Sequence, residues 1–224
     1  MSTAMTPLRI DIVSDVVCPW CFIGFTQLQR ALAQLGDEVE VDLHWHPFEL
    51  NPQMPAEGQE LREHLAQKYG TSVAQSQAAR ARLTQIAESL GVEFRFYEGM
   101  RMHNTFRAHQ LLHWAGEQGK QTELELALFE TNFSRGENVD DPEVLAAAAG
   151  RAGLDEDGAR AVLQDGPYAD TVREEQRFWL SKGIHAVPSF ILDGRYLIPG
   201  AQDPEVFVAA LRRLLDEKAA YGLR

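Results

Sequence analysis

The first fifty residues carry a pattern of apolar positions that predicts a strand, a helix and a second strand. Leu8 to Val13 is rich in β-branched residues and partly alternating, which favours a strand. From Phe22 to Leu35 apolar side chains recur at helical spacing, and Gly36 follows where a helix commonly ends. Val39 to His46 alternates between apolar and polar side chains and predicts the second strand. Two strands joined through a helix are expected to be parallel, with a right-handed crossover.

A long helical block is predicted next. Prolines 47, 52 and 55 make residues 48–55 a loop, and apolar residues then recur at helical spacing from about Gln59 to Gly183. Within this block Asp141-Pro142-Glu143 combines an N-cap residue, a proline for the first turn and an acidic residue. The last helix of the block is expected near Tyr168 to Lys182.

The strand pattern returns toward the carboxy-terminal end. Pro188 to Leu192 and Tyr196 to Ile198 are predicted strands, and the Asp193-Gly194 turn between them favours an antiparallel hairpin. Asp203-Pro204-Glu205 then begins a final helix. Its apolar stripe consists of Val206, Phe207, Ala210, Leu211, Leu214 and Leu215.

The order of elements predicts an α/β protein with a small mixed sheet, βαβ…ββα. This is the outline of a thioredoxin fold with an inserted helical domain. We expect residues 1–56 and 184–224 to form the thioredoxin-like domain, and residues 57–183 to form the inserted helical domain and its connecting helix.

Composition and charge narrow the class of protein. Of the 224 residues 45% are hydrophobic and 24% charged, as in ordinary globular proteins. A net charge of −12, without a local Lys/Arg cluster, argues against nucleic acid as a partner. We see neither the pattern of a secretory signal nor the roughly 20 consecutive apolar residues that span a bilayer. We therefore expect a cytoplasmic protein with no membrane partner.

Both cysteines of the chain lie in one motif, Cys18-Pro19-Trp20-Cys21. In the cytoplasm such a pair is more often catalytic or metal-binding than structural. Directly after a strand, the motif places Cys18 at a helix N-terminus, where free N–H groups and the helix dipole stabilise a thiolate. We expect Cys18 to be an exposed nucleophile and Cys21, one turn later, a buried resolving thiol. Pro19 suits the first helical turn, and Trp20 offers an aromatic face beside the reactive sulfur.

Other uses of these thiols stay open. With His44 and His46, which share one face of the second strand, the cysteines could form a zinc site, although no second paired set of ligands is present. The cysteines could also be inert and buried. His109 and His113, four residues apart on a predicted helix, are another possible ligand pair without an evident third ligand. We therefore predict no metal site.

The chain resembles the DsbA-like thioredoxin family. The resemblance rests on residues 15–21 (DVVCPWC), the helical middle and residues 183–190 (GIHAVPSF), with support from residues 103–108 and 194–202, and covers nearly the whole chain. Within the family it is most like the cytoplasmic FrnE-type members, relatives of 2-hydroxychromene-2-carboxylate isomerase.

The family resemblance implies that the Val187-Pro188 peptide bond is cis and faces the CPWC motif. The backbone of Val187 would then pair with an extended substrate segment. Two differences from the resembled family limit which of its properties we expect in this chain. Some FrnE-type relatives have further cysteines, whereas this chain has no second redox pair. Trp20 stands where secreted DsbA proteins have a histidine, so a strongly oxidising character is not implied.

The sequence thus favours a protein disulfide oxidoreductase that works through a mixed disulfide. Its redox centre would be the Cys18–Cys21 disulfide without a bound cofactor, and glutathione is a possible co-substrate. Expected partners are client proteins or small thiols carrying disulfides, and the chain is expected to be a monomer or a homodimer. Two alternatives stay open: a chaperone-like binding module, and a glutathione-dependent isomerase or transferase. Cys18 weighs against the latter, because those relatives typically carry serine there.

Several further residues are weaker candidates. Asp15 could accept a proton during resolution or be a solvated loop acid. Phe94, Phe96 and Tyr97 could line a groove or pack in the core. The possible contacts to glutathione or substrate, each of which also has an interpretation as loop or helix-cap chemistry, are Asn51, Asn104, Gln202 and Asp203.

Overall fold

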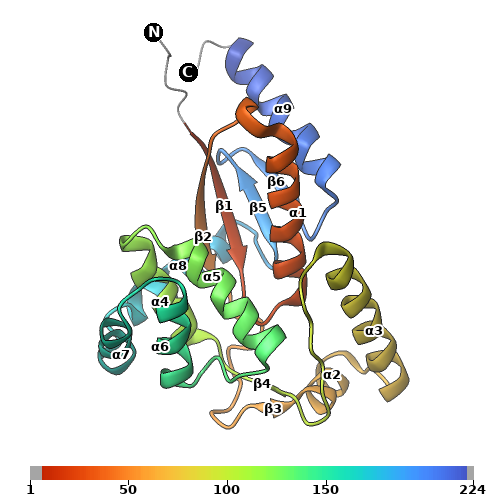
Figure 1. Ribbon diagram of the computed structural model, residues 1–224, viewed down its shortest axis with the longest axis vertical. Helices are drawn as coiled ribbons and strands as arrows, with labels where there is room; N and C mark the ends of the chain where they lie inside the picture. The colour runs from red at the N-terminus through yellow and green to blue at the C-terminus, as the bar shows by residue number, and fades with distance from the viewer. Residues whose placement is uncertain (1–6, 221–224) are drawn as a thin grey trace.

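A mixed sheet of four strands, in the order β2-β1-β5-β6, forms the centre of the computed structural model, which describes residues 7–220 (Figure 1). β1 (Leu8–Ser14) pairs in parallel with β2 (Val41–Pro47) and antiparallel with β5 (Ser189–Leu192). β5 in turn pairs antiparallel with β6 (Tyr196–Pro199). The predicted parallel unit and the predicted hairpin are therefore both confirmed. The hairpin link holds three residues, not two, with Asp193 and Gly194 at positive φ.

Two helices flanking this sheet bury its apolar face. α1 (Pro19–Leu35) and α9 (Pro204–Ala220) pack against each other. Alternate residues of β1, including Ile10 and Ile12, point into the core formed with these helices. α1 begins at Pro19, three residues before the predicted start, and ends before Gly36 as predicted. Val206 is a correction to the predicted stripe of α9, because 43% of it is exposed.

The elements between β2 and β5 are mainly helical. Residues 59–60 and 101–102, predicted within the helical block, instead pair as the short antiparallel strands β3 (Gln59–Glu60) and β4 (Arg101–Met102). The helices of this block are α2 (Leu61–Tyr69), α3 (Val73–Leu90), α4 (Phe106–Glu117), α5 (Gln121–Glu130), α6 (Pro142–Arg151), α7 (Glu156–Asp165) and α8 (Ala169–Ser181).

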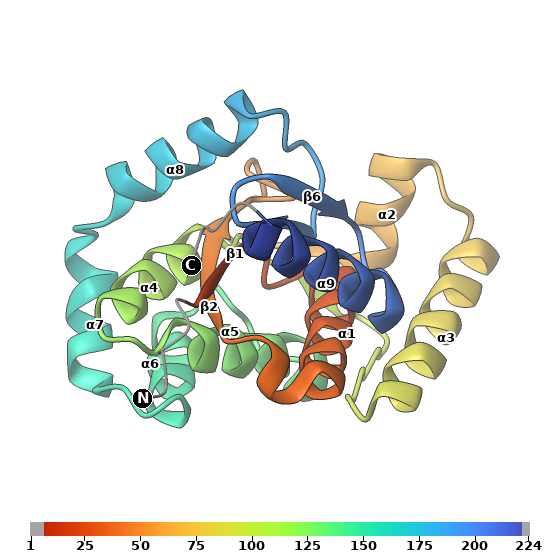
Figure 2. The same ribbon diagram turned by 90° about the horizontal axis from the view of Figure 1, so that it is seen from above.

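These helices form two groups on opposite sides of the sheet and α1 (Figure 2). α4 to α7 surround a second apolar core that includes Leu111, Leu128 and Leu145. α2 and α3 lie on the other side, where α3 packs against α1. The predicted N-cap of α6 is confirmed, since the carboxylate of Asp141 accepts hydrogen bonds from two backbone N–H groups. Within residues 7–220 no helix has the length and apolar composition needed to cross a membrane.

Candidate active site

The CPWC motif occupies the junction between β1 and α1. Cys18 is the N-cap residue of α1, with extended backbone angles, and its carbonyl accepts the N–H of Cys21 at 3.0 Å. Pro19 takes the first helical turn, as predicted. Both cysteines are free thiols, and burial, together with the neighbouring Cys18, raises the pKa of the Cys21 thiol. Because β1 delivers the chain directly to the helix start, Cys18 lies where the helix dipole favours negative charge.

A cis peptide bond faces this junction, as the family resemblance implied. The Val187-Pro188 bond is cis, and the thiol of Cys18 donates to the carbonyl oxygen of Val187 at 3.9 Å. Gly24 of α1 allows the close approach, since a Cβ on that residue would lie 3.1 Å from Cγ of Pro188. The carbonyl of Pro188 is held by the N–H of Gly200 at 2.8 Å. Two segments far apart in the sequence therefore meet at the Cys18 sulfur.

Cys18 is buried, which corrects the expectation of an exposed nucleophile. Only 4% of the residue is exposed, because it lines a cavity of about 370 Å³ over which α2 and α3 lie. Trp20 lines the same cavity and is 41% exposed. The apolar residues that line it include Leu61, Leu65, Leu83, Phe96, Met100 and Phe133.

A few polar groups interrupt the apolar lining. Lys68 of α2 donates to the side-chain oxygen of Asn51 at 2.6 Å and to the carbonyl of Leu50 at 2.7 Å. Ser76 of α3 is buried, and among the described residues its hydroxyl has no hydrogen-bond partner. Burial, together with the charge of Lys68, lowers the pKa of His64. The cavity thus combines an apolar wall with the cationic side chains of Lys68 and Arg80 and a hydroxyl without a hydrogen-bond partner among the described residues.

Of the four weaker candidates, the structure brings only Asn51 to this cavity. Asn104 donates to Glu49 and accepts the N–H of Phe106, so it serves the first turn of α4 although Thr105 is the N-cap residue. Gln202 donates to the carbonyl of Pro199. Asp203 lies directly before α9, and its carbonyl accepts the N–H of Val206.

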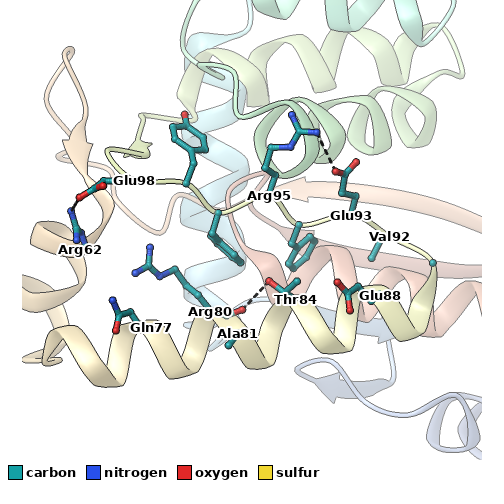
Figure 3. A pocket seen from close by; sticks show the side chains of 14 residues that line it. Arg62, Gln77, Arg80, Ala81, Thr84, Glu88, Val92, Glu93, Arg95 and Glu98 are labelled. Atoms are coloured by element: carbon teal, nitrogen blue, oxygen red, sulfur yellow. Dashed lines mark hydrogen bonds and ion pairs between the residues drawn. The ribbon is translucent and has the colours of Figure 1, made fainter.

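The aromatic residues 94, 96 and 97 divide between core and surface. Phe94 is buried and stacks on Phe133 with ring centroids 4.6 Å apart, whereas Phe96 lines the Cys18 cavity. Phe96 and Tyr97 also border an open groove of about 880 Å³ along α3 (Figure 3). In that groove Arg62 pairs with Glu98, and Arg95 pairs with Glu93.

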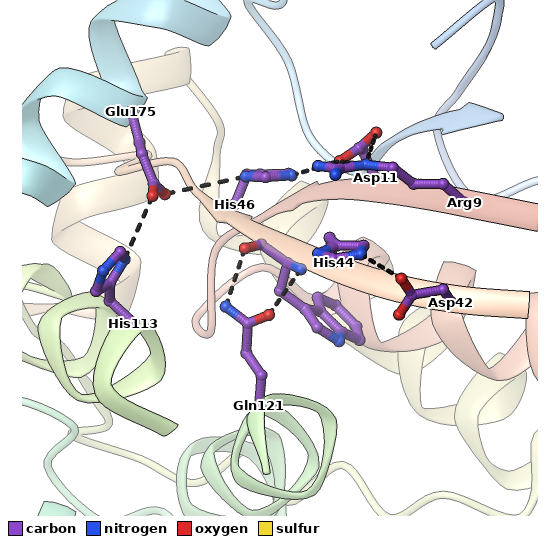
Figure 4. Close-up of polar contacts among 9 residues, drawn as sticks. Arg9, Asp11, Asp42, His44, His46, His113, Gln121 and Glu175 are labelled. Atoms are coloured by element: carbon purple, nitrogen blue, oxygen red, sulfur yellow. Dashed lines mark hydrogen bonds and ion pairs between the residues drawn. The ribbon is translucent and has the colours of Figure 1, made fainter. Parts of the chain in front are cut away.

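The histidines considered as metal ligands have other partners. His44 pairs with Asp42 at 2.7 Å, and His46 pairs with Asp11 at 2.7 Å (Figure 4). Glu175 of α8 lies between His46 and His113, at 3.9 and 3.3 Å. The buried Nε2 of His109 contacts the carbonyl of Phe48 at 2.9 Å. The contacts of His46, His109 and His113 join the sheet and the loop after β2 to the helical block.

The buried carboxylate of Glu125 was not predicted from the sequence. Glu125 of α5 is 1% exposed, and the hydroxyl of Ser14 donates to it at 2.8 Å. Burial raises the pKa of Glu125 to about 7. Its signal in the sequence is an acid within the apolar run Leu124 to Leu128.

Asp15, a weaker candidate from the sequence, is buried, and its carboxylate accepts the backbone N–H of Leu50 at 2.7 Å. It is therefore not a solvated loop acid.

Comparisons with known proteins agree with this arrangement. The model of the DSBA-like thioredoxin domain matches residues 9–212. A probable DsbA oxidoreductase from Streptomyces coelicolor is 37% identical, with a TM-score of 0.86 over 97% of this chain and 91% of that one. Protein YwbO of Bacillus subtilis (strain 168) is 31% identical over 91% of this chain and 96% of its own length.

A more distant solved structure extends the comparison to an isomerase. The 2-hydroxychromene-2-carboxylate isomerase is 16% identical, with a TM-score of 0.67 over 95% of this chain and 98% of that chain. At this identity the likeness is one of fold. The family match over most of the chain, and the two relatives above 30% identity, confirm the predicted family. The chain belongs to the DsbA-like thioredoxin domain family.

Proposed function

We propose that the protein is a thiol–disulfide oxidoreductase that uses Cys18 and Cys21. The observation that carries the proposal is the position of Cys18 at the N-terminus of α1, one turn from Cys21 and facing the carbonyl of Val187. The free N–H groups of the first turn stabilise negative charge on the sulfur of Cys18. The relative from Streptomyces coelicolor, at 37% identity, is a probable DsbA oxidoreductase, which supports the same function for this chain.

The reaction follows from the two sulfur positions. In the direction of substrate reduction, the thiolate of Cys18 attacks a substrate disulfide and forms a mixed disulfide, releasing one substrate thiolate. Cys21 then attacks the sulfur of Cys18 and releases the second substrate thiolate. The enzyme dithiol is oxidised to a disulfide as the substrate disulfide is reduced to two thiols. The reverse sequence oxidises a substrate dithiol.

The burial of Cys18 points to the kind of substrate. A cavity of about 370 Å³ lies within the range typical of small-molecule sites, and its apolar lining favours a compact disulfide or a short extended segment. We propose that small disulfides react faster than folded client proteins. Glutathione is a candidate co-substrate, because Lys68 and Arg80 in the lining offer positive charge to its carboxylates.

The test is a reductase assay on the purified protein with a small-molecule disulfide and with insulin. The wild type is expected to reduce both substrates with dithiothreitol as electron donor, and Cys18→Ser is expected to abolish both reactions. His185→Ser provides a control outside the cavity lining. Reductase activity that persists in Cys18→Ser would refute the proposal.

The same variants separate the two alternatives. The apolar cavity also suits a glutathione-dependent isomerase, since the fold is shared with an isomerase. Isomerisation of a glutathione-requiring substrate that survives Cys18→Ser would establish that alternative. Suppression of client aggregation by the double variant Cys18→Ser/Cys21→Ser, without any reductase activity of the wild type, would favour the binding module.

A further inference from the structure

The segment between α3 and β4, residues 91–98, is anchored along one side. The N–H of Arg95 donates to the carbonyl of Phe133 at 2.7 Å, and the carbonyl of Glu93 accepts the hydroxyl of Ser134 at 2.9 Å. Both partners belong to the turn that follows α5, so alternate residues of the segment face this turn. A contact at every second residue is the pattern of an extended chain, in which the backbone groups of successive residues point to opposite sides.

The other side of this segment carries unpaired backbone groups. Phe94 and Phe96 alternate with the anchored residues, and within residues 7–220 neither their N–H groups nor their carbonyl groups have a hydrogen-bond partner. The side chain of Phe94 is buried and that of Phe96 is half-buried, so packing holds the segment in place while its backbone edge stays free. A free edge of this kind is the feature by which a protein binds an extended polypeptide as an added strand.

The free edge borders the open groove of about 880 Å³ along α3 (Figure 3). Residues 91–98 form one wall of this groove, and α3 forms the other. Two of the lining residues, Arg80 and Phe96, also line the cavity that contains Cys18. The groove therefore adjoins the cavity of the reactive sulfur, and a chain bound along the groove leads toward Cys18.

Two charges of the groove are free to recognise a ligand. Four of the six charged lining residues pair with one another, namely Arg62 with Glu98 and Arg95 with Glu93. The other two, Arg80 and Glu88, have no ion-pair partner in the part of the chain that the structure describes. They are eight residues apart on α3, which is a rise of about 12 Å along the helix. This distance matches about four residues of an extended chain, and residues four apart in such a chain lie on the same face.

We propose that the groove binds an extended segment of a client polypeptide as a strand that pairs with the backbone of Phe94 and Phe96. Outward from the cysteine that enters the Cys18 cavity, the segment carries an acidic side chain opposite Arg80 and, about four residues later, a basic side chain opposite Glu88. Main-chain pairing supplies affinity, and the two charges determine the register. The inference names a substrate class for the proposed function and rests on it. A folded client has to release such a segment first, which agrees with the slower reaction proposed for folded proteins.

The first experiment measures binding without any redox step. A matched peptide has serine in place of the reactive cysteine, followed by an acid and, four residues after the acid, a base; an exchanged peptide has the acid and the base interchanged. Both are labelled with a fluorophore and titrated with the full-length Cys18→Ser/Cys21→Ser variant, and binding is followed by fluorescence anisotropy. The matched peptide is expected to bind at least about fivefold more tightly, because two ion pairs replace two contacts between like charges.

Exchanging the two charges of the protein should reverse this preference. In the same cysteine-free chain, Arg80→Glu/Glu88→Arg is expected to bind the exchanged peptide at least about fivefold more tightly than the matched peptide. Arg82→Glu is the control, because Arg82 is an exposed residue of α3 that lines neither the groove nor the Cys18 cavity. It should keep the original preference. Neither Arg80 nor Glu88 is buried, so both variants are expected to fold, and their melting temperatures check this.

Amide hydrogen exchange, measured by NMR, tests the backbone pairing itself. With the matched peptide bound, the N–H groups of Phe94 and Phe96 should exchange at least about tenfold more slowly than in the free protein. The N–H of Arg95 is an internal control, because it is already bound to the carbonyl of Phe133 and its exchange should change less. This measurement needs no substitution in the groove.

Reversal of the preference by Arg80→Glu/Glu88→Arg, together with slower exchange at Phe94 and Phe96, supports the proposal. Equal affinity for the two peptides, binding of neither peptide, or unchanged exchange at both amides overturns it. A preference that the charge exchange leaves unreversed places the peptide elsewhere and overturns it as well. The proposed function fails by a different result, namely reductase activity that is absent from the wild type or that persists in Cys18→Ser.

Discussion

Glu175 joins three elements of the fold through two histidines, and its replacement by glutamine should change stability in a pH-dependent way. The carboxylate on α8 faces Nδ1 of His46 on β2 at 3.9 Å and Nδ1 of His113 on α4 at 3.3 Å (Figure 4). Burial works against the ionised form of Glu175, but its ion pairs with His113 and His46 outweigh burial and lower its pKa from 4.5 to about 2.

The size of the expected stability change follows from the difference between the ordinary and the lowered pKa of Glu175. A change of about 2.5 in pKa (4.5 − 2) corresponds to about 3.4 kcal/mol at about 1.36 kcal/mol per unit. The side chain is 31% exposed and the histidines share the same interaction, so solvent screening reduces the effect. We expect Glu175→Gln to lower the free energy of unfolding by about 1–2 kcal/mol.

The contribution of these ion pairs to the stability of the protein depends on pH. A carboxylate whose pKa is lowered by folding stabilises the protein above its ordinary pKa of 4.5, and this contribution is lost as the pH falls toward about 2. The pKa of His113 is raised by its ion pair with Glu175, and that of His46 is raised despite burial. Their contribution is complete below 6.5 and is lost as the pH rises through the raised values. The effect of the substitution should therefore be largest between pH 4.5 and 6.5.

Urea unfolding at several pH values measures this dependence. Trp179 provides a fluorescence signal, since its ring lies 4.7 Å from that of His46. Glu174→Gln, an exposed acid next to Glu175, controls for the change in net charge. A loss of stability that is the same at pH 5.5, at pH 8.5 and near pH 3, or equal in both variants, would refute the reasoning.

Two further substitutions test the packing of α1 at the site and the N-cap of α6. Gly24→Ala should destabilise the fold by about 1–3 kcal/mol and reduce turnover, because the added Cβ would lie 3.1 Å from Pro188 and 3.2 Å from Phe190; an unaltered melting temperature would contradict this. Asp141→Ala should cost about 1 kcal/mol in urea unfolding, because α6 loses a side chain that caps two backbone N–H groups. Its reductase activity should equal that of the wild type, and a loss of activity would show that α6 affects the distant cysteines.

The elements that carry the two cysteines could be predicted from the local pattern of apolar and polar residues. The alternation of Leu8 to Val13 and the helical spacing after Phe22 predict β1 and α1, because each element buries one face. The CPWC motif between them then predicts Cys18 at a helix start. The short strands β3 and β4 were missed because two residues carry no periodicity.

The candidate site was predicted less completely, because its remaining parts depend on contacts between distant segments. The sequence alone determined the order of elements, the pair of cysteines at the junction of β1 and α1, and, through family resemblance, the cis Val187-Pro188 bond. Only the tertiary structure decided that α2 and α3 cover Cys18, and that Glu125 reaches Ser14 across 111 residues of sequence. The physical reason is that periodicity reports which face of an element is buried, whereas helix packing and connecting loops determine which side chains meet there.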